Sequence, residues 1–265
     1  MFDSARGEAA GRFAALEACY DPVSQQQLIR TGLGAGWSCL EVGGGSGSLG
    51  HWMGARVGAG GRVIVTEIEP RWAASRERPA QVRLVRHDVV RDPLPDGDFD
   101  LIHARLVLLH LPERLAVLDR LVAALRPGGR LLLEEFDCGW TPVLAAPDSA
   151  STALFERVHQ ALLGLLEGAG ADPLWGRRVL GAMARAGLRE LSATTYAEAW
   201  PGGSRGIDLH RHNTEQVAAD LAVAGIGAAE LADFHRLLRD PEFVVNSYPL
   251  VSVRGRRPLR PEETP

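Results

Sequence analysis

The sequence contains no lysine, so all 29 of its basic residues are arginine. This absence excludes several kinds of site that depend on a lysine amine. A Schiff-base enzyme, a P-loop nucleotide site and a lysine general base all need that side chain. A nicotinamide-dependent reductase would likewise lack the lysine of a catalytic tyrosine–lysine pair.

Cysteine and net charge are also scarce. The three cysteines, Cys19, Cys39 and Cys138, lack the spacing of a metal or redox motif. A formal charge of −4 and a pI near 6.1 give no basic footprint for nucleic acid. We therefore predict a protein that binds neither a metal ion nor nucleic acid.

Long apolar runs are missing as well. No stretch approaches the length of a membrane span, and the N-terminal segment "MFDSARGEAAGRF" lacks the apolar core of a signal peptide. We expect a cytoplasmic protein without membrane contact.

The first half of the chain alternates between short apolar runs and amphipathic segments, with glycine or proline turns between them. Amphipathic helices are expected within 8–31, where Asp21-Pro22 predicts a second helix start, and over 48–57 and 112–125. Buried strands are expected over 38–44, 62–68, 82–89, 99–108 and 130–136. This alternation predicts an α/β fold, a doubly wound parallel sheet with helices on both faces.

The pattern changes after residue 140. Helices near 148–168 and 176–186 precede a strand over 188–200, and a polar helical stretch over 205–240 precedes a strand pair, or one bent strand broken at Pro249, over 242–255. We expect the late strands to form a hairpin-like edge, with the helical stretch placed over the ligand end of the sheet.

One loop, "LEVGGGSGSLG" over 40–50, carries two overlapping glycine motifs. Gly45 to Gly50 spells G-x-G-x-x-G, the dinucleotide-binding fingerprint. Glu41 with Gly43, Gly45 and Gly47 instead suits S-adenosylmethionine. Glycines let a backbone approach a ligand closely, and the following helix offers free N–H groups to it.

Carboxylates after the strands separate these two ligands. Glu67 ends the second strand, where it can accept both ribose hydroxyls of either cofactor. Asp88 ends the third strand and can accept from an adenine amino group, while the Val89 amide donates to a ring nitrogen. Glu41 favours S-adenosylmethionine over a dinucleotide, because a carboxylate near the loop would repel a pyrophosphate but would attract a sulfonium and an ammonium. In this frame Gly50 is a helix-packing residue.

These stretches resemble the class I S-adenosylmethionine-dependent methyltransferases. The resemblance runs through "LEVGGGSGSLG", "VIVTEIEP", "RHDVVRDPLPDGDFDLIHARLVLLHLPE" and "LRPGGRLLLEE", roughly residues 35–136. The whole chain is similar to small-molecule methyltransferases of actinobacterial type, which accompany natural-product pathways. The family implies a Rossmann-like seven-stranded sheet, mostly parallel with the last strand reversed.

The resemblance also implies which residues meet S-adenosylmethionine. It assigns the glycines to the methionine and ribose end, Glu67 to the ribose, Asp88 and Val89 to adenine, and the start of the loop after the fourth strand to the methionine moiety. The full set is Glu41, Gly43, Gly45, Gly47, Glu67, Ile68, Asp88, Val89, Ala104 and Arg105.

The substrate side offers fewer candidates. His110, in "LLHLP", is the candidate general base and substrate contact, because an imidazole can take a proton near neutral pH. Tyr20 and Trp140 are further candidates for substrate binding. His103 is expected in a buried pair, and Arg105 is expected either on the N-terminal helices or on the cofactor carboxylate.

The expected organisation has four parts. N-terminal helices over 1–34 cover the site, 35–140 form the cofactor-binding core, 141–255 complete the fold with a lid at about 200–240, and 256–265 form a tail.

The resulting hypothesis is methyl transfer to an O, N or C nucleophile of a small apolar or aromatic metabolite, by in-line displacement, in secondary metabolism. Two alternatives stay open: an enzyme that uses the cofactor without methylating, as a cyclase or scaffold, and an NAD(P)-dependent reductase. The expected partner is a small-molecule substrate, with a homodimer possible.

Overall fold

The computed structural model describes residues 9–75 and 77–259. Its main feature is a seven-stranded sheet in the order β3-β2-β1-β4-β5-β10-β7. Its strands are β1 Ser38–Val42, β2 Arg62–Glu67, β3 Val82–Arg86, β4 Phe99–Arg105, β5 Leu125–Phe136, β7 Arg189–Tyr196 and β10 Leu250–Arg256.

The strand directions confirm the predicted fold class. β1 to β5 pair in parallel, whereas β10 is antiparallel to both β5 and β7. The late strands β7 and β10 therefore form the expected edge, and β10 is the reversed last strand. Strand order changes direction between β1 and β4, and the crevice beside such a switch point is where open α/β sheets bind ligands.

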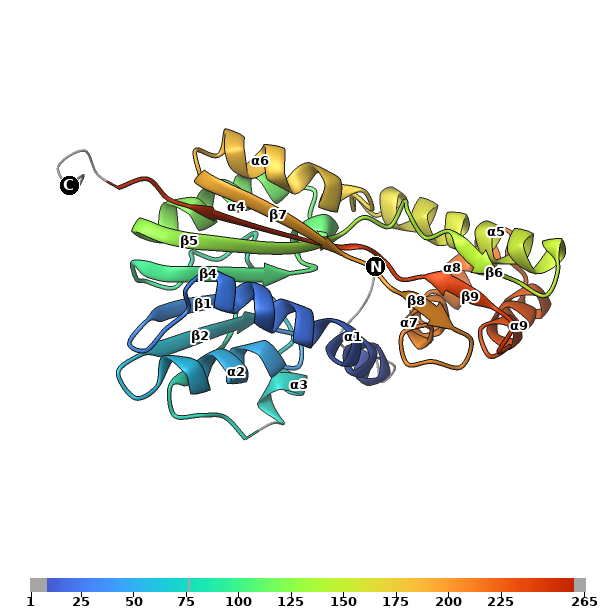
Figure 1. Ribbon diagram of the computed structural model, residues 1–265, viewed down its shortest axis with the longest axis horizontal. Coiled ribbons are helices and arrows are strands. Elements are labelled where there is room, and N and C mark those ends of the chain that lie inside the picture. Colours follow the sequence, from blue (N-terminus) through green and yellow to red (C-terminus); the bar gives the residue numbers. More distant parts are fainter. Residues whose placement is uncertain (1–8, 76, 260–265) are drawn as a thin grey trace.

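Helices cover both faces of this sheet (Figure 1). One face packs against α4 Arg114–Ala124 and α6 Val179–Arg185, which follows the short helix η2 Trp175–Arg178. The other packs against α1 Ala9–Arg30 and α2 Ser48–Val57. The short α3 Arg71–Ala74 follows β2. Strands buried on both faces explain the continuous apolar runs in the sequence.

The prediction of two N-terminal helices is wrong, because α1 is a single helix with Pro22 inside it. Proline fits helical φ and removes only one backbone donor, so a well-anchored helix can tolerate it. The anchors flank Pro22: the buried Tyr20 hydroxyl donates to the Tyr248 carbonyl at 2.8 Å, and Asp21 and Ser24 both bond Arg105.

A second part of the chain lies beyond the carboxyl ends of the parallel strands (Figure 1). It holds a small antiparallel sheet in the order β6-β9-β8, which the sequence did not predict. The helices and strands of this second part are β6 Val143–Ala145, α5 Ser149–Gly168, β8 Ala199–Pro201, α7 Asp208–Gln216, α8 Ala218–Val223, α9 Ala228–Leu237 and β9 Val244–Asn246. The expected strands over 188–200 and 242–255 each divide between the two sheets, the second of them around Pro249.

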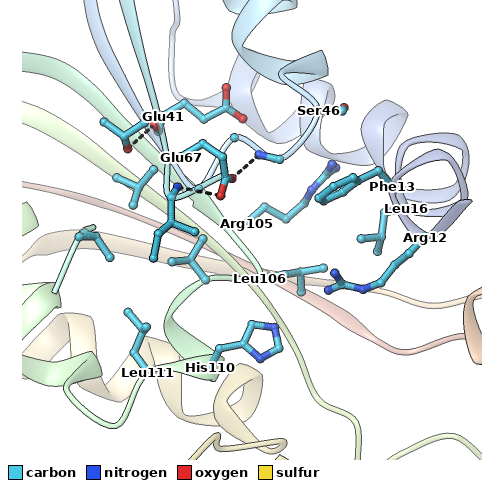
Figure 2. A pocket seen from close by; sticks show the side chains of 18 of the residues that line it. Arg12, Phe13, Leu16, Glu41, Ser46, Glu67, Arg105, Leu106, His110 and Leu111 are labelled. Atoms are coloured by element: carbon cyan, nitrogen blue, oxygen red, sulfur yellow. Dashed lines mark hydrogen bonds between the residues drawn. The ribbon is translucent and has the colours of Figure 1, made fainter. Parts of the chain in front are cut away.

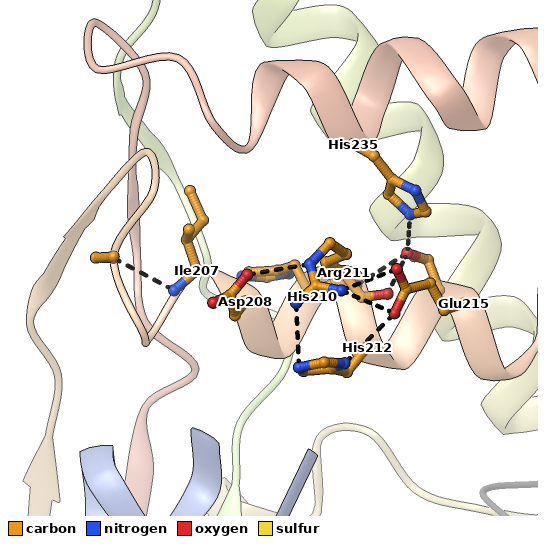
Figure 3. Close-up of polar contacts among 9 residues, drawn as sticks. Ile207, Asp208, His210, Arg211, His212, Glu215 and His235 are labelled. Carbon is orange, nitrogen blue, oxygen red and sulfur yellow. Dashed lines mark hydrogen bonds and ion pairs between the residues drawn. The ribbon is translucent and has the colours of Figure 1, made fainter. Parts of the chain in front are cut away.

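Helix α7 connects this part to α1. A Cβ added to Gly11 would lie 2.5 Å from the His212 ring, so the two helices pack closely there. Polar contacts run along α7: Arg211 bonds Asp208 and Glu215, and Thr214 lies 2.9 Å from His235 of α9 (Figure 3). The expected tail over 256–265 begins inside β10, and 260–265 lie outside the described residues.

Gly50 on α2 gives a test of this packing. An added Cβ would lie 2.3 Å from Val65 Cγ2 and 2.6 Å from Glu41 Oε2. Because buried Val65 is stiff, Gly50→Ala should lower the free energy of unfolding by about 1–3 kcal/mol in urea denaturation. The matched control is Gly164→Ala on α5, where nothing lies within 4 Å and stability should rise by up to about 1 kcal/mol. Equal effects of the two substitutions would contradict this packing.

Candidate active site

A cleft of about 280 Å³ opens at the carboxyl ends of β1 to β4. The glycine loop and two carboxylates lie at one end, and His110 lies at the other (Figure 2). Side chains of α1, among them Arg12, Phe13 and Leu16, form one wall. The predicted residues that line the cleft are Glu41, Gly43, Gly45, Glu67, Ile68, Asp88, Val89, Arg105 and His110.

The loop after β1 needs its three alternating glycines for conformation. Gly43, Gly45 and Gly47 have φ of 65°, 57° and 83°, in the left-handed region that other residues avoid. A Cβ on Gly43 would also lie 2.5 Å from Val107 Cγ2. Gly47 directly precedes α2 as its N-cap. The backbone itself therefore forms this wall of the cleft.

Glu67 ends β2 and ties it to the glycine loop. Its carboxylate accepts the Gly45 N–H at 2.7 Å and the Ile68 N–H at 2.9 Å. Burial raises the pKa of Glu67, while these backbone donors oppose that rise. The Glu69 N–H also reaches Oε1, at 3.4 Å, whereas Oε2 keeps a further lone pair, so a ligand hydroxyl can donate to a carboxylate whose position is already fixed.

The loop after β3 brings a second carboxylate to the cleft. The expected strand is shorter than predicted, because the chain leaves the sheet after Arg86. Asp88 accepts the Val90 N–H at 2.9 Å, and Arg120 of α4 holds the Val89 carbonyl at 2.8 Å. Among the described residues the Val89 N–H donates to no acceptor. An acceptor and a free donor thus stand side by side.

A buried polar chain runs beneath the glycine loop. Glu41 Oε1 lies 3.8 Å from His103 Nδ1, and His103 Nε2 lies 3.1 Å from Glu134 Oε2. Ser252 of β10 donates to Glu134 at 2.6 Å. Burial pushes the pKa of Glu134 up, but the His103 contact and nearby Arg105 bring it below its usual value.

Glu41 occupies the cleft end of this chain. It is 4% exposed, and its Oε2 finds no hydrogen-bond partner among the described residues. Burial raises the pKa of Glu41 to about 8, against the opposing effect of Arg105. A buried acid without a full set of partners is costly, and a cationic ligand would offset that cost.

The loop after β4 connects the sheet to α1. Arg105 bonds Asp21 at 2.8 Å and Ser24 at 3.0 Å on α1, and it also lines the cleft. Leu106 follows with φ of 57°, a conformation that is strained for a leucine and typical of functional sites. The sequence carried no signal of this strain.

His110 ends the short helix η1 Leu108–His110. Glu135 of β5 holds the start of that helix by accepting the Leu108 N–H at 2.8 Å. Burial, with a contribution from nearby Arg12, lowers the pKa of His110 to about 3. The imidazole is therefore neutral at physiological pH.

The cleft-lining residues of the described chain do not include Gly47, Ala104, Tyr20 or Trp140. Ala104 is fully buried in β4, and Tyr20 is fully buried against Phe136 and Trp200. Trp140 is 55% exposed in the loop after β5. The predicted substrate contacts at Tyr20 and Trp140 are therefore corrected: one is a core aromatic and the other a surface one.

Side chains that the sequence reasoning missed come from α1. Phe13 lies over the glycine loop, where a Cβ on Gly45 would approach its ring to 3.0 Å. Glu17 accepts a hydrogen bond from the Ser46 hydroxyl. The helical period of 8–31 showed that some face of this segment is apolar, but it gave no indication of which loop that face meets.

The described residues hold no group of three or more His, Cys, Asp or Glu side chains placed to bind a metal ion. Their helices include none with the length and apolarity needed to cross a bilayer.

Glu41 should make stability depend on pH. Between pH 4.5 and about 8 the folded chain keeps a proton that the unfolded chain releases, so this group destabilises the fold as pH rises. Relative to wild type, Glu41→Gln should gain stability from pH 5 to pH 8, by a few kcal/mol at about 1.4 kcal/mol per pKa unit. Urea denaturation at several pH values measures this, with exposed Glu156→Gln as the control. A difference that does not change with pH would contradict the buried, protonated acid.

His110 gives a second pH test. Its side-chain resonances, assigned by comparison with His110→Gln, should not shift between pH 5 and pH 8 in an NMR titration, because its pKa lies near 3. A midpoint near 6.5 would show that water reaches this end of the cleft.

Comparison with known proteins agrees with this geometry. Residues 40–131 match the model of a methyltransferase domain. The chain is 30% identical over 171 residues to the methyltransferase str2 of Strobilurus tenacellus, covering 62% of this chain and 59% of that protein. It is 31% identical over 121 residues to the ubiquinone/menaquinone biosynthesis C-methyltransferase UbiE of Laribacter hongkongensis (strain HLHK9), covering 44% and 50%. The chain thus spans about half to three fifths of the length of these relatives.

A solved structure extends the comparison to the fold. A methyltransferase from Bacillus halodurans C-125 superposes with a TM-score of 0.55 at 16% identity, covering 88% of this chain and 98% of that one. Residues 40–131 thus match a methyltransferase domain, and the seven-stranded sheet has the same fold as that solved structure.

Proposed function

We propose that this chain transfers a methyl group from S-adenosylmethionine to an O, N or C atom of a small apolar or aromatic metabolite. The observation that carries the proposal is the buried Glu41, which lines the cleft beside the glycine loop and whose Oε2 has no hydrogen-bond partner among the described residues. The residues present fit that cofactor: Glu67 would hold the ribose, Asp88 and Val89 the adenine, and Glu41 would lie near the cationic end. When bound, S-adenosylmethionine supplies a methyl group on a leaving sulfur that is already activated.

The chain's own contribution is orientation and exclusion of water. Phe13 and Leu16 of α1 cover the cleft, and the Glu17–Ser46 and Arg105–Asp21 contacts hold α1 against the loops. These contacts would keep the acceptor atom in line and dry.

We propose His110 as the base that collects the proton of the acceptor. A pKa near 3 makes it a weak base, yet it is neutral and can accept a proton. A weak base is sufficient for an oxygen or ring-carbon acceptor, because either atom carries positive charge once it has gained a methyl group and its proton is then strongly acidic.

Two observations support an apolar acceptor. The far end of the cleft is lined by leucines, including Leu106, Leu111 and Leu166. The relative UbiE is named as a C-methyltransferase of quinone biosynthesis, and the relative str2 is also a methyltransferase. A natural-product substrate, a cytoplasmic location and a homodimer stay predictions.

Binding of the cofactor is the first test. Isothermal titration should show S-adenosylmethionine and S-adenosylhomocysteine binding to the wild-type chain and not NADH. Glu67→Gln should weaken binding about 10- to 100-fold, the range for losing a hydrogen bond to a charged group. Glu156→Gln, an exposed carboxylate on α5, is the control and should bind as wild type. Absence of binding to the wild type would overturn the proposal.

The non-methylating alternative needs a separate measurement. With methyl-labelled S-adenosylmethionine, the label should appear on the acceptor. Label that stays on the cofactor while the acceptor changes would favour a cyclase or scaffold role.

A further inference from the structure

A second cavity lies next to the cleft and shares part of its wall. Both are lined by Arg12, Leu16, Leu106, His110 and Leu166. We call this second cavity the inner chamber. Its space is about 30 Å³, room for one or two water-sized groups and too little for a whole ring. The chamber can therefore take only the tip of a ligand whose body lies in the cleft.

The other walls of the chamber are largely apolar. They come from the end of β5, from α5, from α7 and from the segment before β10, and include Phe136, Leu162, Leu163 and Leu209. Asn213 lies one helical turn after Leu209, on the same face of α7. A buried amide among leucine side chains costs free energy unless its polar atoms are hydrogen-bonded.

Asn213 has one polar atom without a partner. Its side chain is 7% exposed, and its Oδ1 finds no hydrogen-bond donor within residues 9–75 and 77–259. An acceptor that is buried and unpaired costs free energy, so native proteins keep few of them. A ligand donor in the chamber would remove that cost.

The neighbouring hydroxyl fixes which amide atom is free. Burial raises the pKa of Tyr248, and the nearby Asn213 side chain opposes that rise, as an amide N–H directed at the hydroxyl does. The Tyr248 hydroxyl in turn lies 2.9 Å from Nδ1 of His210, a buried and neutral imidazole. The Asn213 nitrogen is therefore assigned to the Tyr248 side, and Oδ1, which has no donor among the described residues, remains for a ligand.

We propose that Asn213 is a specificity-determining residue, which selects substrates that carry a hydroxyl or N–H at the end remote from the methyl-accepting atom. That group would enter the inner chamber and donate to Asn213 Oδ1, while the apolar body lies against Leu106 and Leu166. An ether or a carbonyl there would set an acceptor against an acceptor. The inference rests on the proposed methyl transfer, because it needs the reacting atom in the cleft.

A pair of matched probes tests this selection. The protein is saturated with S-adenosylhomocysteine, which prevents turnover, and titrated calorimetrically with 4-butylphenol and with 4-butylanisole. The two share an apolar body and differ in whether the oxygen can donate. Wild type should bind the phenol about 10- to 100-fold more tightly, the range for one buried hydrogen bond. Asn213→Leu, which keeps the branching of the side chain but has no acceptor, should bind both within about threefold of each other.

A second variant separates selection from folding. Asn213→Asp keeps an oxygen acceptor and should keep the preference for the phenol, and thermal melting should show both variants folded. If Asn213→Leu fails to fold, the two probes on wild type and Asn213→Asp still decide the question.

The possible failures point to different claims. If S-adenosylhomocysteine does not bind, the proposed function fails. If it binds but wild type does not prefer the phenol, or binds neither probe, only the role of Asn213 and its chamber is overturned.

Discussion

A carboxylate buried beneath a loop without side chains is the constraint on which this site depends. Glu41 lies under Gly44 and Gly50, where added Cβ atoms would approach its carboxylate to 3.6 Å and 2.6 Å. Behind it stand His103, Glu134 and Ser252, on β4, β5 and β10. Four strands thus hold one acid at the floor of the cleft. A bare backbone above an acid is suited to a cationic ligand and unsuited to a pyrophosphate.

The rest of the architecture closes that cleft. Arg105 follows the strand that carries His103 and binds α1 through Asp21 and Ser24. Helix α1 lies on the glycine loop through Phe13 and packs against α7 at Gly11. A displacement of α1 would therefore disturb both the cofactor end and the chamber lined by α7. The reaction needs orientation and exclusion of water more than acid–base strength. The position of α1, which contacts both ends of the site, therefore bears directly on the reaction.

The sequence predicted what depends on local pattern. Strand runs, the helices over 48–57 and 112–125 and the glycine loop follow from neighbouring residues, so the sheet and one end of the cleft could be foreseen. Contacts between distant segments could not. Tyr20 was expected at the ligand, yet its hydroxyl bonds the carbonyl of Tyr248, 228 residues away. The packing of Gly11 on His212 could not be predicted for the same reason, because the two residues are far apart in the sequence. Nor could the three-stranded β6-β9-β8 sheet, whose strands have only three residues each.

The two ends of the site come from different parts of the chain. The match to the methyltransferase domain covers residues 40–131, which hold the glycine loop, Glu67, Asp88 and His110. Most walls of the inner chamber lie outside that range: Arg12 and Leu16 before it, and Phe136, Leu162, Asn213 and Tyr248 after it. The cofactor end is thus built mainly from one continuous segment, with α1 packed on it, and the acceptor end from elements gathered from the whole chain. Most of these walls are leucine, which selects ligands by shape alone. Discrimination between similar apolar molecules therefore depends on the few polar atoms among them.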